Sequence, residues 1–131
     1  MSADLEIQFA LYTAVSALGL RCYDAAPQAV DGGDASAFPF VTVGLVTLGP
    51  FDTQSSTGFE FTATLHVRSR ARGMKETKEI QGLLYEALHR QTLEVSGFQP
   101  ILLQFANATC LQAPDGTFHG VSEFRGLIEA T

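Results

Sequence analysis

The fold is decided by the stretch from Gly58 to Leu88, which reads GFEFTATLHV, RSRARG and MKETKEIQGLLYEAL in succession. Its first part alternates apolar and polar side chains over Phe59–Val67, and a period of two predicts a strand that is buried on one face only. His66 falls on the polar face, where we interpret it as a solvated or cross-strand-paired imidazole. The last part has apolar residues at helical spacing and predicts a helix over residues 74–92 that packs on the sheet. The apolar stripe of this helix comprises Ile80, Leu83, Leu84, Ala87 and Leu88.

A basic segment joins this strand to this helix. Five of the eight Lys and Arg residues of the chain lie in residues 68–78, which contain a single acid, Glu76. We call these five residues the basic cluster: Arg68, Arg70, Arg72, Lys75 and Lys78. Cations near the start of a helix oppose its dipole. Cations in this unfavourable position, with no evident local compensation, indicate a functional site or an interface. The alternative is a solvated charged surface.

Length and charge narrow the class of protein. The 131 residues suit one compact domain that spans residues 1–131. The net charge of -6 argues against a dedicated nucleic-acid-binding protein, although the basic cluster has the opposite local sign. Only 17% of the residues are charged, against about 25% in a typical soluble domain. Such a composition suits a subunit that buries part of its exterior against neighbours; the alternative is an ordinary monomer.

The first 57 residues predict a helix, a long loop and a strand. We expect the helix over Asp4–Leu18, with a left-handed cap at Gly19. One face of it is apolar, and the opposite face carries Gln8, Thr13, Ser16 and several alanines, which suits either contact with another subunit or partial exposure. The apolar face comprises Leu5, Phe9, Tyr12, Val15 and, close by, Leu18. Residues 20–23 suggest a short edge strand, and residues 24–38 form an Ala, Gly, Asp and Pro-rich loop.

The strand that follows this loop is apolar on both faces from Phe40 to Leu48, which predicts a central or doubly covered position. A polar loop over residues 49–57 then leads into the strand at Phe59. This loop contains three candidate interface residues, which are Phe51, Asp52 and Gln54.

The last third of the chain predicts a β-hairpin. A strand over Ile101–Gln112 and a second over Phe118–Glu129 flank the turn Ala113–Thr117, in which Pro114 presets φ and Gly116 supplies a permissive backbone. The fold class is therefore α+β. We expect an antiparallel or mixed sheet of about four to five strands with two helices packed on one face, in the order α-β-β-α-β-β.

Catalytic, metal and cofactor motifs are absent from the sequence. It has no phosphate-binding glycine loop, no paired cysteines and no nucleophile elbow. Its three histidines and two cysteines match no metal spacing. Cys110 with His119, if they faced each other across the last hairpin, would be the only nucleophile and base candidate. No residue supplies the orienting third group or an oxyanion hole, so we reject this pair. Cys22 and Cys110 suit free thiols in a reducing compartment, and no apolar run approaches the roughly 18 residues of a membrane span. We therefore expect no enzyme, no metal, no cofactor and no membrane contact.

Several stretches together resemble the tail-completion, or tail-terminator, proteins of long-tailed phages and of gene transfer agents. They are RCYDAAPQ at residues 21–28, FPFVTVG at 38–44, LHVRSR at 65–70 running into Gly73, and PDG at 114–116 before His119 and Gly120. The similarity covers about residues 5–129 and rests on order and spacing. Residues 30–37 depart from it as an insert.

The resemblance implies a structural virion protein that is assembled in the host cytoplasm. It implies a ring, commonly a hexamer, at the head-proximal end of the tail tube, where the ring stops tube polymerisation and contacts the head connector. Its partners would be further copies of itself, the tail tube protein and the connector or stopper, with DNA passing through the lumen without specific binding. The basic cluster would pair with acidic residues of a neighbour, and the 49–57 loop would reach toward the tube or connector. The alternative is a nucleic-acid-binding α+β module that uses the basic cluster on phosphates.

Overall fold

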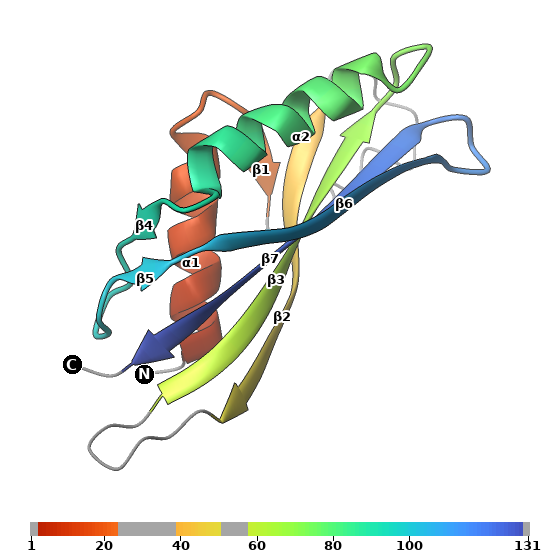
Figure 1. The fold of residues 1–131 in the computed structure, drawn as a ribbon. Coiled ribbons are helices and arrows are strands. Elements are labelled where there is room, and N and C mark those ends of the chain that lie inside the picture. The colour runs from red at the N-terminus through yellow and green to blue at the C-terminus, as the bar shows by residue number, and fades with distance from the viewer. Residues whose placement is uncertain (1–2, 24–38, 51–57, 130–131) are drawn as a thin grey trace.

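A computed structural model describes residues 3–23, 39–50 and 58–129 of the chain. Two helices and seven strands make up this part (Figure 1). In chain order they are α1 (Ala3–Ser16), β1 (Cys22–Tyr23), β2 (Phe40–Pro50), β3 (Gly58–Ser69), α2 (Lys75–Leu88), β4 (Thr92–Leu93), β5 (Ile101–Leu102), β6 (Gln104–Gln112) and β7 (Phe118–Glu129).

The main sheet has five strands in the order β1-β2-β3-β7-β6, and β4 and β5 form a separate two-stranded sheet. β1 runs parallel to β2 at one edge, whereas all other neighbours in the main sheet are antiparallel. The predicted α+β class, the mixed five-stranded sheet and the short edge strand at residues 20–23 are therefore confirmed. The order of elements also follows the prediction, apart from the additional short strands β1, β4 and β5.

β3 is the central strand of the main sheet, a position that we expected for residues 40–48, and its alternating pattern correctly predicted a strand that is buried on one face. It pairs with β2 on one side and along its whole length with β7 on the other. Phe61, Ala63, Leu65 and Val67 point to one face of the sheet and are almost fully buried there. Both helices pack on this inner face, because Ile7 and Leu11 of α1 and Ile80 and Leu84 of α2 belong to the same hydrophobic core. The polar residues of β3 line the outer face, which neither helix covers.

α1 faces the sheet with a different side from the one we predicted. Leu5 and Phe9 of the predicted apolar face are 61% and 66% exposed, and Tyr12 and Leu18 are exposed as well. The buried side consists of Ala3, Ile7, Ala10, Leu11 and Val15. The helix is apolar on both sides, so periodicity alone could not select the core face. This side packs into the hydrophobic core with its aliphatic residues, and the aromatic rings of Phe9 and Tyr12 are left on the outer side.

α2 also differs from its prediction at its end and in its stripe. It stops at Leu88 and not at residue 92, because Arg90 adopts a left-handed φ of 59° and the chain turns into β4. Leu83 of the predicted stripe is 48% exposed. The buried side begins one turn earlier and includes Thr77 and Gln81. Gly120 of β7 allows this approach, since a Cβ there would lie 2.6 Å from both Thr77 Cγ2 and Gln81 Nε2.

Two predicted strands are only partly correct. β2 is largely buried only in its first half, Phe40–Val43, whereas Leu45, in the bulge between Val43 and Val46, is 70% exposed. The predicted strand 101–112 is broken at Leu103, whose backbone bonds to Arg90 and Gln91 and not to β7. The final hairpin is confirmed: Ala113 N donates to Thr117 O, and Gly116 has a positive φ of 90°.

Candidate interaction site

The basic cluster lies at one end of the molecule, where β3 passes into α2. Arg68 is half-buried at the end of β3, whereas Arg70, Arg72, Lys75 and Lys78 are exposed on the turn and on the first turn of α2. Lys75 and Glu79 form a fully hydrated ion pair at 3.8 Å, an arrangement that contributes little to stability. Four of the five side chains of the cluster are therefore accessible at the surface.

Ser69 holds the turn of the basic cluster in place. Its hydroxyl is completely buried, donates to Glu76 Oε1 at 2.6 Å and accepts a hydrogen bond from Ala71 N at 3.0 Å. One side chain thus ties the end of β3 to the turn and to the first turn of α2. α2 has no side-chain cap at Met74, and this contact between two side chains links its first turn to β3.

Two histidines lie beside Arg68 on the outer face of the sheet. His66 Nδ1 and His119 Nε2 are 2.8 Å apart and share a hydrogen bond between β3 and β7. Partial burial, and then the charge of Arg68, lower the pKa of both rings below 6.5. The interpretation of His66 as a cross-strand-paired imidazole is therefore confirmed, and the pair adds no positive charge to the cluster at neutral pH.

Charges of opposite sign occupy opposite ends of the molecule. Glu60 and Arg68 are eight residues apart on β3, or roughly 26 Å at about 3.3 Å per residue. α1 begins and β7 ends at the end of the molecule that lies away from the basic cluster (Figure 1). The described acids at that end are Asp4, Glu6, Glu60, Glu94 and Glu129. Three further described acids, Glu76, Glu79 and Asp115, lie at the end that carries the five cations of the basic cluster. Among the described residues the two ends therefore differ in charge, and each presents a different surface to a partner.

Three other predicted interface residues, Phe51, Asp52 and Gln54, lie outside the described residues, as do most of the 49–57 loop and the whole 24–38 loop. The structure brings the five residues of the basic cluster into one region of the surface, as their sequence positions predict. It does not place the 49–57 loop relative to them.

The rejected candidate pair of Cys110 and His119 does not form in the structure. Cys110 stands opposite Gly120, and His119 stands opposite Leu111. Neighbouring positions on a strand point to opposite faces, so the thiol lies on the inner face and the imidazole on the outer face. The described residues hold no group of three or more His, Cys, Asp or Glu side chains placed to bind a metal ion. Neither described helix is long and apolar enough to cross a membrane.

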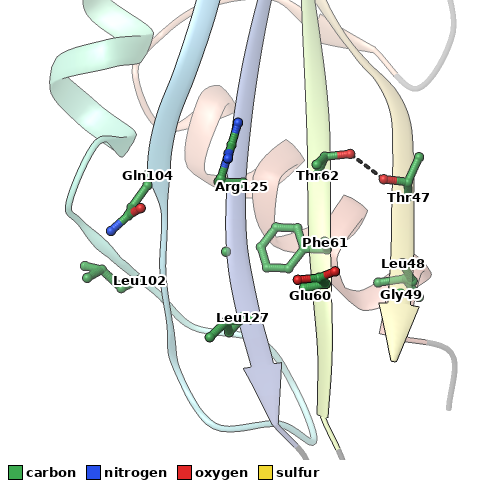
Figure 2. Close-up of a pocket in the computed structure, with 11 residues that line it drawn as sticks. Thr47, Leu48, Gly49, Glu60, Phe61, Thr62, Leu102, Gln104, Arg125 and Leu127 are labelled. Carbon is green, nitrogen blue, oxygen red and sulfur yellow. Dashed lines mark hydrogen bonds between the residues drawn. The ribbon is translucent and has the colours of Figure 1, made fainter. Parts of the chain in front are cut away.

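Two surfaces escaped the sequence analysis. The first is the exposed apolar side of α1 with Leu5, Phe9 and Tyr12. The second is a groove of about 710 Å³ on the outer face, which Figure 2 shows with α1 behind the strands. It is lined by Thr47, Leu48, Gly49, Glu60, Phe61, Thr62, Leu102, Gln104, Arg125, Gly126 and Leu127. The absence of charged residues in α1 after Glu6 was a sequence signal for the exposed apolar side of the helix. The groove is formed by five separate strands, so no local sequence pattern indicates it.

Comparison with known proteins agrees with this organisation. The family described as tail completion protein gp17 matches residues 8–129. No relative is found among curated protein sequences. Among solved structures, a chain of the virion of a native gene transfer agent particle superposes with a TM-score of 0.82 at 20% sequence identity, with 98% of each chain covered. At that identity the likeness shows the fold, and the family match extends over all but the first seven and last two residues.

Proposed function

The chain belongs to the tail completion protein gp17 family and is a structural protein of the virion tail, and from this premise we propose that it is the tail terminator. Copies of the chain form a ring, which we propose to be a hexamer, on the head-proximal end of the tail tube. The ring stops polymerisation of the tube and joins it to the head connector or stopper. DNA passes through the lumen of the ring without specific binding.

This proposal is supported mainly by the position of the basic cluster at one end of the fold and of several acidic residues at the other. A terminator ring contacts two different partners, one above and one below it, and a subunit with one basic and one acidic end suits that position. Arg70 and Arg72 are exposed on the turn that forms the basic end. They pair with acidic residues of the adjacent component, and complementarity of this kind sets orientation and register more than affinity.

A structural role fits the surface better than an enzymatic one. The single nucleophile and base candidate, Cys110 with His119, has its two side chains on opposite faces of the sheet. His119 Nε2 is instead bonded to His66. We propose that neither residue takes part in a reaction, and that both serve the fold.

Deletion and charge reversal test the proposal. A strain lacking this chain should produce overlong tail tubes and heads without tails, seen by electron microscopy, and the wild-type chain should restore joined tails. The variant Arg70→Glu with Arg72→Glu should fold normally and fail to restore joining. Tails of normal length from the deletion strain would contradict the terminator role, whereas normal joining by the charge-reversed variant would contradict only the role of the basic cluster.

Two controls separate charge from other effects. Arg70→Lys with Arg72→Lys keeps the charge of the cluster and should restore joining at least in part. Arg90→Glu reverses an exposed charge outside the cluster and should behave as wild type. Loss of joining in Arg90→Glu would indicate a general effect of net charge and not a docking surface.

A nucleic-acid-binding function is the second candidate, because four of the five cluster residues are exposed together. Binding to phosphates through them would fall steeply as salt is raised. Retention of the purified chain on a DNA column at low salt, lost in the Arg70→Glu and Arg72→Glu variant, would favour this candidate. No retention at low salt would remove it.

A further inference from the structure

We propose that the exposed apolar side of α1, centred on Phe9, docks into the outer-face groove of a second copy of this chain. This inference rests on the proposed ring and assigns the two surfaces by which neighbouring copies meet. The α1 surface consists of Leu5, Phe9 and Tyr12. The groove is the one shown in Figure 2, between β2, β3, β5, β6 and β7.

α1 has the composition of a helix that is covered on both sides. Its inner side is fully buried at Ile7 and Leu11, yet its outer side carries two large side chains, Leu5 and Phe9, that are more than 60% exposed. From residue 7 to the end of the helix there is no charged side chain. A helix that is apolar on both sides is typical of a buried helix, and the described residues of the chain leave the outer side of α1 uncovered at Leu5 and Phe9.

Phe9 has the shape of an anchoring residue. It lines two shallow hollows at once, one with Leu5, Tyr12 and Tyr23 and the other with residues 93–96. The ring therefore projects between the hollows as a ridge. Exposed aromatic rings that fill a partner's pocket dominate the energetics of protein interfaces.

The groove offers a complementary shape on a different part of the same chain. Leu48, Leu102 and Leu127 line it and are 37%, 50% and 47% exposed. Its hollow is large enough for an aromatic ring and a leucine, which need a few hundred Å³. α1 lies against the inner face of the sheet and the groove opens on the outer face, so the two surfaces do not coincide. A contact between two different surfaces repeats from copy to copy and closes into a ring when the rotation permits.

Charge agrees with this pairing. Glu6 and Glu94 border the hollow beside Phe9. Arg125 stands exposed in the groove and, within residues 3–23, 39–50 and 58–129, forms no ion pair. The groove also contains Glu60, two positions along the sheet from Arg125. We therefore place Glu6 of one copy next to Arg125 of the other, away from Glu60.

Cross-linking in assembled particles tests the contact. In a Cys110→Ser background, Phe9→Cys with Leu127→Cys in one chain should give a ladder of covalent oligomers when purified tails are treated with a short bismaleimide. Leu83→Cys with Leu127→Cys is the matched control, since Leu83 is 48% exposed but lies on α2, and it should remain monomeric. Phe9, Leu83 and Leu127 are all exposed, so the fold should tolerate the cysteine substitutions. Circular dichroism of each variant checks this.

The outcomes distinguish this inference from the proposed function. A covalent dimer from Phe9→Cys alone would mean that α1 meets α1, and no ladder from particles that contain the double variant would mean that copies do not meet here. Either result overturns the inference and leaves the terminator role intact, because that role is read from tail length and joining. Glu6→Arg should reduce incorporation into tails at least tenfold, and adding Arg125→Glu should restore it; restoration by the unrelated Arg90→Glu would overturn the charge pairing.

Discussion

His66 and His119 face each other across β3 and β7, with their ring nitrogens 2.8 Å apart and their ring centres 5.0 Å apart. One imidazole must donate and the other must accept, so the bond exists only while at least one ring is neutral. Gly44 makes room for this arrangement, since a Cβ there would lie 2.5 Å from the His66 ring. The pair stands next to Arg68 of the basic cluster, whose positive charge lowers the pKa of both rings.

The histidine pair predicts a loss of stability in mild acid. Burial and Arg68 hold the pKa of both rings below 6.5 in the folded chain, while the unfolded chain titrates near 6.5. The unfolded state therefore binds more protons as the pH falls below 6.5, and the free energy of unfolding should decrease across that window. Above pH 7 it should be flat. Urea unfolding at pH 7.5, 6.5 and 5.5 measures this directly.

The double variant His66→Asn with His119→Asn is the control for this prediction. It should be less dependent on pH between 7.5 and 5.5 than the wild type. An equal dependence in both proteins would assign the effect to other groups. Asp115, whose pKa is lowered by hydrogen bonds from Thr117 and by Arg68, does not interfere, because its contribution is lost only below the ordinary aspartate range.

Leu11→Ala should destabilise the isolated chain much more than Phe9→Ala does. Leu11 is fully buried, and its truncation should cost about 2–5 kcal/mol in the free energy of unfolding. Phe9 is 66% exposed, and its truncation should change that free energy by about 0.5 kcal/mol or less. Chemical denaturation of the two purified variants compares them. A larger loss for Phe9→Ala would mean that the aromatic side of α1 faces the core.

Gly120→Ala should destabilise the packing of α2 on the sheet. The added Cβ would meet Thr77 Cγ2 and Gln81 Nε2 at 2.6 Å. Gln81 donates a hydrogen bond to Thr109 O at 2.9 Å and cannot move freely. Overpacking of this kind costs about 1–3 kcal/mol. Gly82→Ala on the open side of α2 meets nothing within 4 Å and should instead stabilise by about 0.5–1 kcal/mol. Thermal unfolding of both variants tests this prediction. Equal changes in stability for Gly120→Ala and Gly82→Ala would contradict a tight contact between Gly120 and α2.

Ser69→Ala should loosen the turn that carries the basic cluster. The change removes the hydroxyl that joins Glu76 Oε1 and Ala71 N, and should cost about 1–3 kcal/mol. Amide exchange at Ala71 should accelerate more than exchange in the middle of β3. Glu76→Gln keeps an acceptor oxygen for Ser69 and should cost less. Unchanged exchange at Ala71 in Ser69→Ala would show that the turn is held by other contacts.

The sequence by itself determined the parts of this fold whose signals are local. Alternation along β3 was enough to place Phe61, Leu65 and Val67 in the core, because a strand with one covered face must repeat every two residues. Turn chemistry at Pro114 and Gly116 was enough for the last hairpin. The clustering of five cations between Arg68 and Lys78 also survives folding, because a turn and one helical turn keep neighbours in sequence close in space.

Only the tertiary structure decided what depends on register and on a choice between two similar faces. α1 is apolar on both sides, so its pattern could not choose between Phe9 and Leu11 for the core. Packing against the sheet determined that Leu11 is buried and Phe9 is exposed. Cys110 and His119 fall on opposite faces, and His66 meets His119, because a shift of one residue in strand pairing moves a side chain to the other face of the sheet. Pairing of strands distant in sequence also builds the groove around Arg125, so no single stretch of sequence contains it.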